Sequence, residues 1–239
     1  MKIENFISLV IPVYNEEESI DATIRISDEY LRNITKNYEI IVVDDGSDDK
    51  TGKIIDECAN TCFHVKPIHN IRNEGSGKSL FIGFKNARGE FLVSNFADMP
   101  FDIRELQNIL HLFKESGADF VVVSRKDRKA NSIYRKITSL ANYWLIRLFF
   151  NVRVNDFQFV QVYKKKVLDA VKVQSKGTFV PPEIIIKALS MGFKMEEYLT
   201  DFHPRILGSS KCGNFTVIGQ TIYEIVRFWF IWVILRCRH

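Results

Sequence analysis

The stretch Glu39-Ile40-Ile41-Val42-Val43-Asp44-Asp45-Gly46-Ser47 joins an unbroken apolar run to two adjacent carboxylates and a glycine-bearing turn. An apolar run of this length, rich in β-branched residues, predicts a buried strand of a parallel sheet. Asp44 and Asp45 then lie at the carboxyl end of the strand, the edge where open α/β sheets bind their ligands. The alternative is that the turn only caps a helix, through Ser47 or one of the two aspartates that follow it.

Short apolar runs alternate with amphipathic segments through the first half of the chain. Five runs are expected to be strands, at residues 6–13, 39–43, 64–68, 91–94 and 120–124. Helices are expected between them at residues 17–32, 53–60, 78–87 and 103–116. Because strands that alternate with helices pair through right-handed crossovers, the pattern predicts an α/β fold with a mostly parallel, Rossmann-like sheet flanked by helices.

The chain of 239 residues, 46% of them hydrophobic, is large enough for one sizeable core. We expect one domain at residues 1–212, followed by a carboxyl-terminal amphipathic helix at 213–239. The apolar segment 228–235 is too short to span a membrane, which needs about 20 apolar residues. Its tryptophans and phenylalanines beside Arg227 and Arg236 are typical of a helix that lies in the membrane interface. Packing on the core or on a second copy of the chain is the alternative.

The composition of the chain limits which kinds of partner it binds and in which cellular compartment it is found. The formal net charge of +4 is too small for a uniform nucleic-acid-binding surface, so we expect no nucleic-acid partner. The four cysteines have neither zinc-ligand spacing nor the density of a disulfide framework, and the amino terminus lacks a signal-peptide pattern. A second aromatic helix with a basic face is expected at 133–150. These features predict a peripheral protein at the cytoplasmic face of a membrane, and they are compatible with a homo-oligomer.

A glycine-rich turn precedes the helix expected from Lys78, in the stretch Gly75-Ser76-Gly77-Lys78-Ser79. Such turns bind phosphate through backbone N–H groups at a helix start. The full loop of nucleotide triphosphatases is absent, because Arg72 occupies the position of its first glycine. Gly75 and Lys78 are therefore candidate phosphate contacts, and a tight bend without a ligand is the alternative.

The strand expected at 91–94 is followed by Asn95-Phe96-Ala97-Asp98, which brings a further carboxylate to the edge that holds Asp44 and Asp45. A Mg²⁺ or Mn²⁺ ion bound with a nucleotide diphosphate often takes only one or two protein carboxylates. Asp98 is therefore the candidate metal ligand and a candidate catalytic residue.

Candidate acceptor residues lie in the second half of the chain. Asp156 stands among apolar neighbours, where it could act as a general base, orient an acceptor, or simply face solvent at a turn. Arg125 and Arg135 are expected near anions, because guanidinium groups match phosphate oxygens. The stretch 205–211 sets glycine and serines between Arg205 and Lys211, a pattern typical of a mobile phosphate-gripping loop.

Three segments, taken in order, resemble the inverting family 2-type nucleotide-sugar glycosyltransferases that include the dolichyl-phosphate mannose synthases. They are VIPVYNE at 10–16, VVDDGS at 42–47 and NEGSGK at 73–78. The segments 123–125 and 204–211 are similar to two later motifs of the same family. The resemblance implies a glycosyltransferase-A fold.

The resemblance also implies roles for individual residues. Those around the nucleotide sugar would be Pro12, Tyr14, Glu16, Asp44, Asp45, Gly75, Lys78, Asp98, Arg205 and Lys211. Asp98 would hold Mg²⁺ or Mn²⁺ with the diphosphate. In the subfamily that uses polyprenyl phosphate, the lipid phosphate would be bound by Arg125, Arg135 and Ser209.

Phe96 departs from the family pattern, because it stands where the first carboxylate of the metal motif is expected. Metal dependence is therefore left open by the sequence. The expected function is transfer, with inversion, of one sugar from a nucleotide-diphosphate sugar to dolichyl or undecaprenyl phosphate at the membrane surface. The alternatives are transfer to a hydroxyl of a glycan or lipid, and a catalytically silent protein that binds nucleotide sugars.

Overall fold

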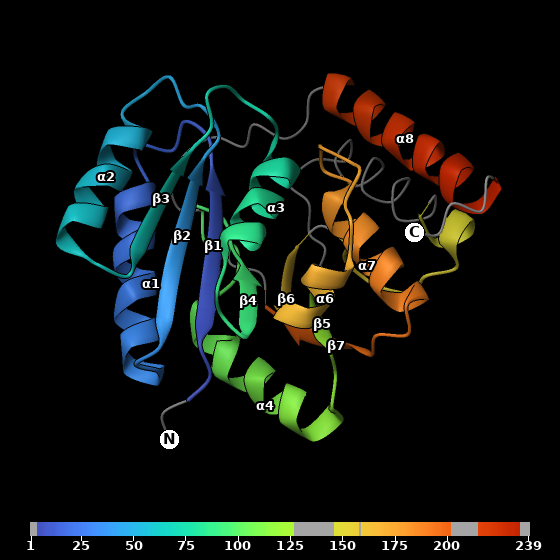
Figure 1. Ribbon diagram of the computed structural model, residues 1–239, viewed down its shortest axis with the longest axis horizontal. Coiled ribbons are helices and arrows are strands. Elements are labelled where there is room, and N and C mark those ends of the chain that lie inside the picture. Colours follow the sequence, from blue (N-terminus) through green and yellow to red (C-terminus); the bar gives the residue numbers. More distant parts are fainter. Residues whose placement is uncertain (1–3, 127–145, 158, 202–214, 235–239) are drawn as a thin grey trace.

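The structure, a computed structural model, describes residues 4–126, 146–157, 159–201 and 215–234 (Figure 1). One sheet of seven strands, in the order β3-β2-β1-β4-β6-β5-β7, runs through the molecule. All five expected strands are present: β1 (Ile7–Val13), β2 (Tyr38–Asp44), β3 (Val65–His69), β4 (Phe91–Ser94) and β5 (Phe120–Arg125). The expected α/β class with a mostly parallel sheet is thereby confirmed.

The four helices expected between these strands are also present. They are α1 (Ile20–Ile34), α2 (Thr51–Thr61), α3 (Ser76–Asn86) and α4 (Leu106–Ser116), the last preceded by the 3-10 turn η1 (Ile103–Glu105). Asp102 caps that turn, because its side chain accepts a hydrogen bond from the Arg104 N–H. Gly117 ends α4 in the left-handed conformation, with φ of 68°.

The second half of the sheet contains two strands that the sequence patterns did not indicate. β6 (Val160–Lys164) lies between β4 and β5 and is antiparallel to both, whereas β7 (Met195–Thr200) is parallel to β5. Between them lie α6 (Lys165–Ala170) and α7 (Val180–Ser190). Two prolines in the first turn of α7 are compatible with the helix, because backbone N–H groups there have no partner within it.

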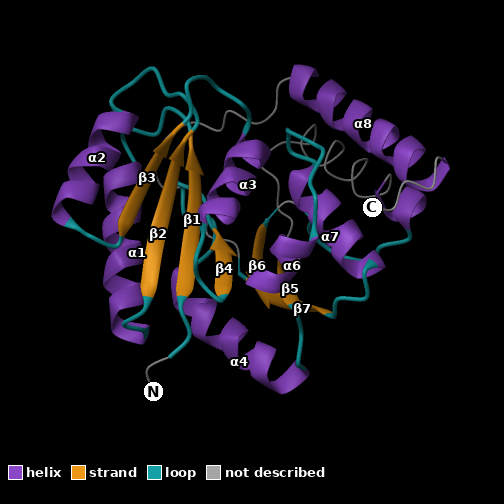
Figure 2. Cartoon of the chain, in the orientation of Figure 1, coloured by secondary structure: helices purple, strands orange, loops and turns teal. Residues whose placement is uncertain are grey.

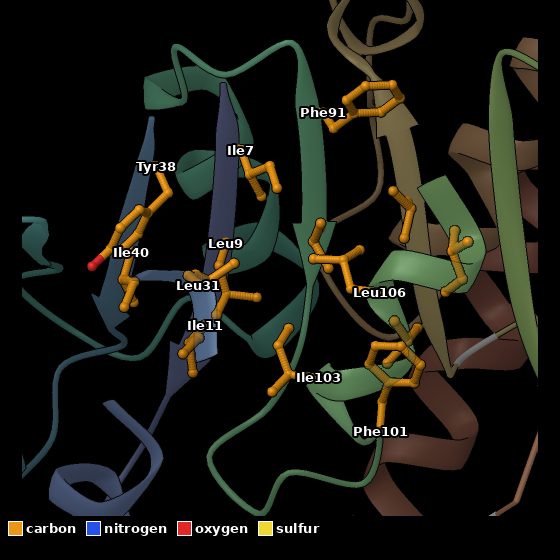
Figure 3. Packing of buried hydrophobic residues seen from close by; sticks show 14 of the residues in the cluster. Ile7, Leu9, Ile11, Leu31, Tyr38, Ile40, Phe91, Phe101, Ile103 and Leu106 are labelled. Carbon is orange, nitrogen blue, oxygen red and sulfur yellow. The ribbon is translucent and has the colours of Figure 1, made fainter. Parts of the chain in front are cut away.

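The alternating side chains of the strands supply a core on each face of the sheet. Ile7, Leu9 and Ile11 of β1 point to the face covered by α1, α2 and α4, where they pack near Ile103 and Leu106 (Figure 3). Val10 of β1 points to the other face, which α3, α6 and α7 cover (Figure 2). At Gly83 of α3 an added Cβ would lie 2.2 Å from Val10 Cγ1, so this glycine allows α3 to approach the sheet closely.

The carboxyl-terminal segment forms α8 (Phe215–Trp229) and a π-helical turn, η2 (Phe230–Ile234). Its inner side packs into the core on the sheet face that α3, α6 and α7 cover. There the Phe228 ring lies 5.5 Å from Phe179 and stacks on Trp232 at 5.4 Å. Residues 146–150, the described end of the helix expected at 133–150, are helical, and Phe150 contacts the Phe228 ring at 5.4 Å. No helix in the described ranges is long and apolar enough to span a bilayer. The expected boundary at residue 212 falls outside the described residues.

Candidate functional site

One edge of the sheet collects the described candidate residues. The parallel strands β1, β2 and β4 end at this edge, and so do β5 and β7. Because β6 runs antiparallel to β4 and β5, its amino end lies at the same edge and brings Asp156 there. Asp44 and Asp45 therefore lie on the β1–β3 side of the edge, Asp156 and Arg125 on the β5–β6 side, and Asp98 follows β4 between them.

Asp45 is almost fully engaged by the protein itself. Its side chain is 2% exposed, and Oδ1 accepts hydrogen bonds from Asn70 Nδ2 (2.9 Å), the Glu74 N–H (2.9 Å) and the Ser79 hydroxyl (2.7 Å). Oδ2 accepts from the Gly75 N–H at 2.9 Å. The carboxylate thus ties the end of β2 to the turn that begins α3.

Asp44 is buried beside it but has fewer partners. Oδ1 accepts from the Ser47 N–H at 3.0 Å, and Oδ2 lies 3.2 Å from Nδ1 of His69, the last residue of β3. The other ring nitrogen of His69 lies 3.0 Å from Asp56 Oδ1. Burial disfavours the charged ring, but the hydrogen bonds to Asp44 and Asp56 outweigh it and raise the pKa of His69. Sequence patterns missed His69 and Asp56, although His69 immediately follows an expected strand.

The loop after β1 interlocks with the loop after β2. Asn15, at φ of 52°, donates its N–H to the Ser47 hydroxyl at 2.9 Å and accepts from the Asp48 N–H at 2.8 Å. Glu16 donates its N–H to the Thr51 hydroxyl at 2.8 Å. These hydrogen bonds hold together the two loops that carry the residues expected to bind the nucleoside.

The remaining two candidates from β1 lie at the same place. Pro12 is buried in the strand, opposite Val43 of β2, and Tyr14 is partly buried just beyond the end of β1. Lys50, the residue just before α2, forms no side-chain cap, but Asp49 Oδ1 accepts the N–H of Thr51, the first residue of the helix, at 2.9 Å. A ligand site at the end of β2 and a capping bond at the start of α2 are therefore compatible interpretations of this turn.

The glycine turn is enclosed by the segment that precedes α7. Gly75 has φ of 96°, and the Lys78 N–H donates to the Lys176 carbonyl at 2.9 Å. An added Cβ at Gly77 would lie 1.9 Å from the Gly177 carbonyl oxygen, so only glycine fits there. The Lys78 ammonium forms an ion pair with Glu74. The N–H groups of Gly75 and Lys78 are thus both used within the protein.

Helix α8 reaches the same segment from its other side. Glu224 Oε1 accepts hydrogen bonds from the N–H groups of Lys176 and Gly177, both at 3.1 Å. The hydroxyls of Thr178 and Thr221 are 2.7 Å apart. Residues 176–178 therefore connect the inner face of α8 to the start of α3.

Asp98 lies on a tight turn after β4 and is partly exposed. The Met99 N–H donates to the Phe96 carbonyl at 2.9 Å, and the Thr23 hydroxyl holds the Ala97 carbonyl at 2.6 Å. In the part of the chain that the structure describes, no group of three or more His, Cys, Asp or Glu side chains could hold a metal ion. Among the described residues, Asp98 is therefore not part of a cluster of three such ligands.

Arg125 and Asp156 form an ion pair, with Nε and Oδ2 2.7 Å apart. Asp156 is 4% exposed, so the interpretation of this residue as a solvent-facing turn is wrong. The guanidinium also lies over the Phe159 ring, 5.2 Å from its centroid. Two residues that the sequence suggested separately are thus one unit.

Glu197 of β7 supports this pair and was missed by sequence reasoning. Its carboxylate accepts from the Asn155 N–H at 2.9 Å, from Asn155 Nδ2 at 2.8 Å and from the Ser124 hydroxyl. It therefore fixes the residues next to Arg125 and Asp156 in both chain segments. Four other candidates lie outside the described residues: Arg135, Arg205, Ser209 and Lys211.

Known proteins are similar to this chain in sequence and in fold. Glycosyltransferase AglD of Haloferax volcanii is 29% identical over 231 residues, and the undecaprenyl-phosphate 4-deoxy-4-formamido-L-arabinose transferase of Shewanella sediminis is 30% identical over 220 residues. These matches cover 93% and 90% of this chain but only 37% and 64% of the relatives' own lengths.

Two solved structures match the fold, each at 16% identity. Mannosyl-3-phosphoglycerate synthase from Rubrobacter xylanophilus has a TM-score of 0.72, covering 98% of this chain and 76% of that one. Glucosyl-3-phosphoglycerate synthase from Mycobacterium tuberculosis, in complex with Mn²⁺, uridine diphosphate and phosphoglyceric acid, has a TM-score of 0.71, covering 95% and 78%.

The family model of glycosyl transferase family 2 matches residues 8–172, which include β2 to β6 and all of β1 except Ile7. The match confirms the family that the three sequence segments suggested. The chain belongs to glycosyl transferase family 2.

Proposed function

We propose that the protein transfers one sugar from a nucleotide-diphosphate sugar to a polyprenyl phosphate, with inversion at the anomeric carbon. The Arg125–Asp156 ion pair at the sheet edge carries this proposal, because it combines a cation for an acceptor phosphate with a carboxylate that is already engaged. One relative is named as an undecaprenyl-phosphate sugar transferase, which supports the same class of acceptor.

The donor side of the site is the β1–β3 half of the edge. Asp44, which has one hydrogen-bond contact at each oxygen, is the best placed carboxylate for a nucleoside N–H or hydroxyl, with Pro12, Tyr14 and Glu16 beside it. Asp45 supports the donor side indirectly, because its four hydrogen bonds shape the turn from which Lys78 projects. Arg205 and Lys211 would complete the diphosphate contacts.

A divalent cation fits this site if the donor supplies most of its ligands. Asp98 is the residue that would hold it, since a Mg²⁺ or Mn²⁺ ion bound with a nucleotide diphosphate needs only one or two protein carboxylates. Such an ion would stabilise the charge that develops on the departing diphosphate. Phe96 adds no ligand there, so the proposal relies on Asp98 alone among the residues of this turn.

The acceptor side needs a cation more than it needs a base. An acceptor phosphate is anionic near neutral pH, so its oxygen can attack the anomeric carbon while the bond to the departing diphosphate breaks, and no proton has to be removed. The five N–H donors of Arg125 are enough to contact both Asp156 and a phosphate oxygen. Arg135 and Ser209 would add to the same phosphate site, and electrostatic stabilisation supplies most of the catalysis.

The outer face of α8 fits a membrane surface, where a polyprenyl acceptor resides. Ile222 and Val226 of α8 and Phe230 of η2 are 40%, 45% and 50% exposed, and their spacing of four residues puts them on one side of the helical segment. Tyr223 and Arg227 flank them, as expected for a helix at the level of the lipid headgroups. We place this contact at the cytoplasmic face, in keeping with the cysteine content of the chain.

Transfer to labelled lipid tests the proposal. Purified protein is incubated with labelled nucleotide sugars, polyprenyl phosphate in vesicles, and Mg²⁺ or Mn²⁺. We expect a labelled glycolipid, about a hundredfold less of it with R125A, and little change with R25A, which removes an exposed arginine paired with Asp21. D156N separates the alternatives, because it should abolish transfer to a hydroxyl but only weaken transfer to a phosphate.

Three outcomes would count against this function. Label on a hydroxyl acceptor alone would favour transfer to a glycan or lipid hydroxyl. Nucleotide-sugar binding without transfer or hydrolysis, under every combination of lipid and metal, would favour a catalytically silent binding protein. Equal vesicle binding by the wild type and a V226D variant would remove the role proposed for α8.

A further inference from the structure

The imidazole ring of His69 lies between two carboxylates from different elements. Its Nδ1 is 3.2 Å from Asp44 Oδ2 on β2, and its Nε2 is 3.0 Å from Asp56 Oδ1 on α2. A neutral imidazole has one N–H and can donate to only one of them, whereas the imidazolium donates to both. The geometry therefore fits the charged ring.

The surroundings of the ring favour the same state. Asp44 and Asp56 are the charged groups that face it from β2 and α2, and the cation in the first turn of α2, Lys53, forms an ion pair with Glu57 at 3.7 Å. Gly52, in the same turn, leaves room for the contact, since an added Cβ would lie 2.9 Å from Asp44 Oδ2. The first turn of α2 opposes a positive charge through its N–H groups, and the two carboxylates outweigh this effect.

The ring can exchange its proton with solvent, because the His69 side chain is 40% exposed. Once it loses that proton, one of the two carboxylates loses its donor. In the tautomer that keeps its N–H toward Asp56, Asp44 Oδ2 has lost this donor, and among the described residues the Ser47 N–H still holds Oδ1. A titration at the edge strand β3 thus acts on the carboxylate that faces the donor side.

We propose that His69 is a positioning residue for donor binding: as an imidazolium it orients Asp44 toward the nucleoside, and its deprotonation weakens the binding of the nucleotide. The inference rests on the proposed function, in which Asp44 contacts the nucleoside. His69 would not contact the nucleotide itself but would act through Asp44. The affinity for the donor would therefore depend on pH.

Calorimetric titration with a panel of nucleoside diphosphates (uridine, guanosine, cytidine and thymidine), from about pH 6 to about pH 9, tests this role. For the nucleotide that binds, we expect Kd to rise about tenfold through the titration of His69. H69N keeps a donor toward Asp44 but cannot titrate, so its Kd should not change with pH. D56N removes one carboxylate and should move the midpoint to lower pH.

H64N is the matched control, since His64 lies at the opposite end of β3 and stacks on Tyr38. It should leave the pH profile unchanged. Nuclear magnetic resonance of the imidazole groups gives the pKa of His69 directly, with the signal assigned by its loss in H69N. A midpoint of Kd that coincides with this pKa supports the inference, as does a shift of both in D56N.

Other outcomes overturn it. A nucleotide that binds with the same Kd at every pH, while His69 titrates in the range, refutes the role of His69 and leaves the proposed function intact. A measured pKa of His69 at or below its ordinary value would refute the imidazolium bridge. If no nucleotide of the panel binds at any pH, the proposed donor site fails and this inference fails with it.

Discussion

Replacing Asp45 with asparagine should destabilise the protein by about 3 kcal/mol, because the carboxylate is buried and accepts four hydrogen bonds. The amide oxygen can keep the Oδ1 position, but the amide nitrogen would face the Gly75 N–H donor. The Gly75 N–H would keep only its longer contact with Asn73 Oδ1, at 3.1 Å, and the loss of its bond to the buried carboxylate costs about 1–2 kcal/mol. The other three bonds lose the carboxylate charge, which weakens each by roughly half a kcal/mol.

Urea unfolding and thermal unfolding near neutral pH measure this effect. For a chain of 239 residues, a loss of about 3 kcal/mol lowers Tm by about 6–12 °C. D48N is the matched control, since Asp48 lies in the same loop with an exposed side chain, and it should change the free energy of unfolding by less than about 0.5 kcal/mol.

The same variant separates two roles for Asp45. If D45N were as stable as the wild type but bound nucleotide more weakly, Asp45 would contact the nucleoside directly and the structural role argued from its four hydrogen bonds would be refuted.

Three further perturbations follow from the structure. G77A should destabilise by more than about 3 kcal/mol, because its Cβ would collide with the Gly177 carbonyl, whereas G219A, which meets no atom within 4 Å, should stabilise α8 by up to about 1 kcal/mol; urea midpoints decide both. K187M should cost about 3–5 kcal/mol in the same assay, because it leaves the buried Glu183 carboxylate without its ion-pair partner. K166M, which removes an exposed lysine paired with the partly buried Asp119, should cost less than about 1 kcal/mol. The raised pKa of His69 should stabilise the fold fully below about pH 6.5, and this contribution should be lost as pH rises through the folded pKa; a slope equal in wild type and H69N would contradict it.

The first half of the fold could be predicted because its signals are local. Apolar runs and helical periodicity identified β1 to β5, and these elements fix Asp44, Asp45 and Asp98 at one edge. β6 and β7 gave no such signal: Val160–Lys164 is short, and Met195–Thr200 carries two adjacent glutamates. Their direction and neighbours depend on contacts between distant segments.

The hydrogen bonds and ion pairs within the site could not be predicted from sequence patterns. Arg125 and Asp156 were both singled out, yet their pairing exists only because β6 runs antiparallel beside β5. The four hydrogen bonds that Asp45 accepts, and the contacts of His69 with Asp44 and Asp56, likewise depend on loops that fold back over the end of β2. A pattern that locates a carboxylate at an edge does not show which of its oxygens the protein itself uses.

Helix α8 packs on the protein with its inner side and exposes its outer side. Glu224, on the inner side, accepts the N–H groups of Lys176 and Gly177, whose carbonyls enclose the glycine turn at the start of α3. Ile222 and Val226, on the outer side, are 40% and 45% exposed. Under the proposed function, exchange of the outer residues would retarget the protein to another lipid surface and keep the Glu224 hydrogen bonds, whereas removal of α8 would take away the carboxylate that holds the segment around the glycine turn.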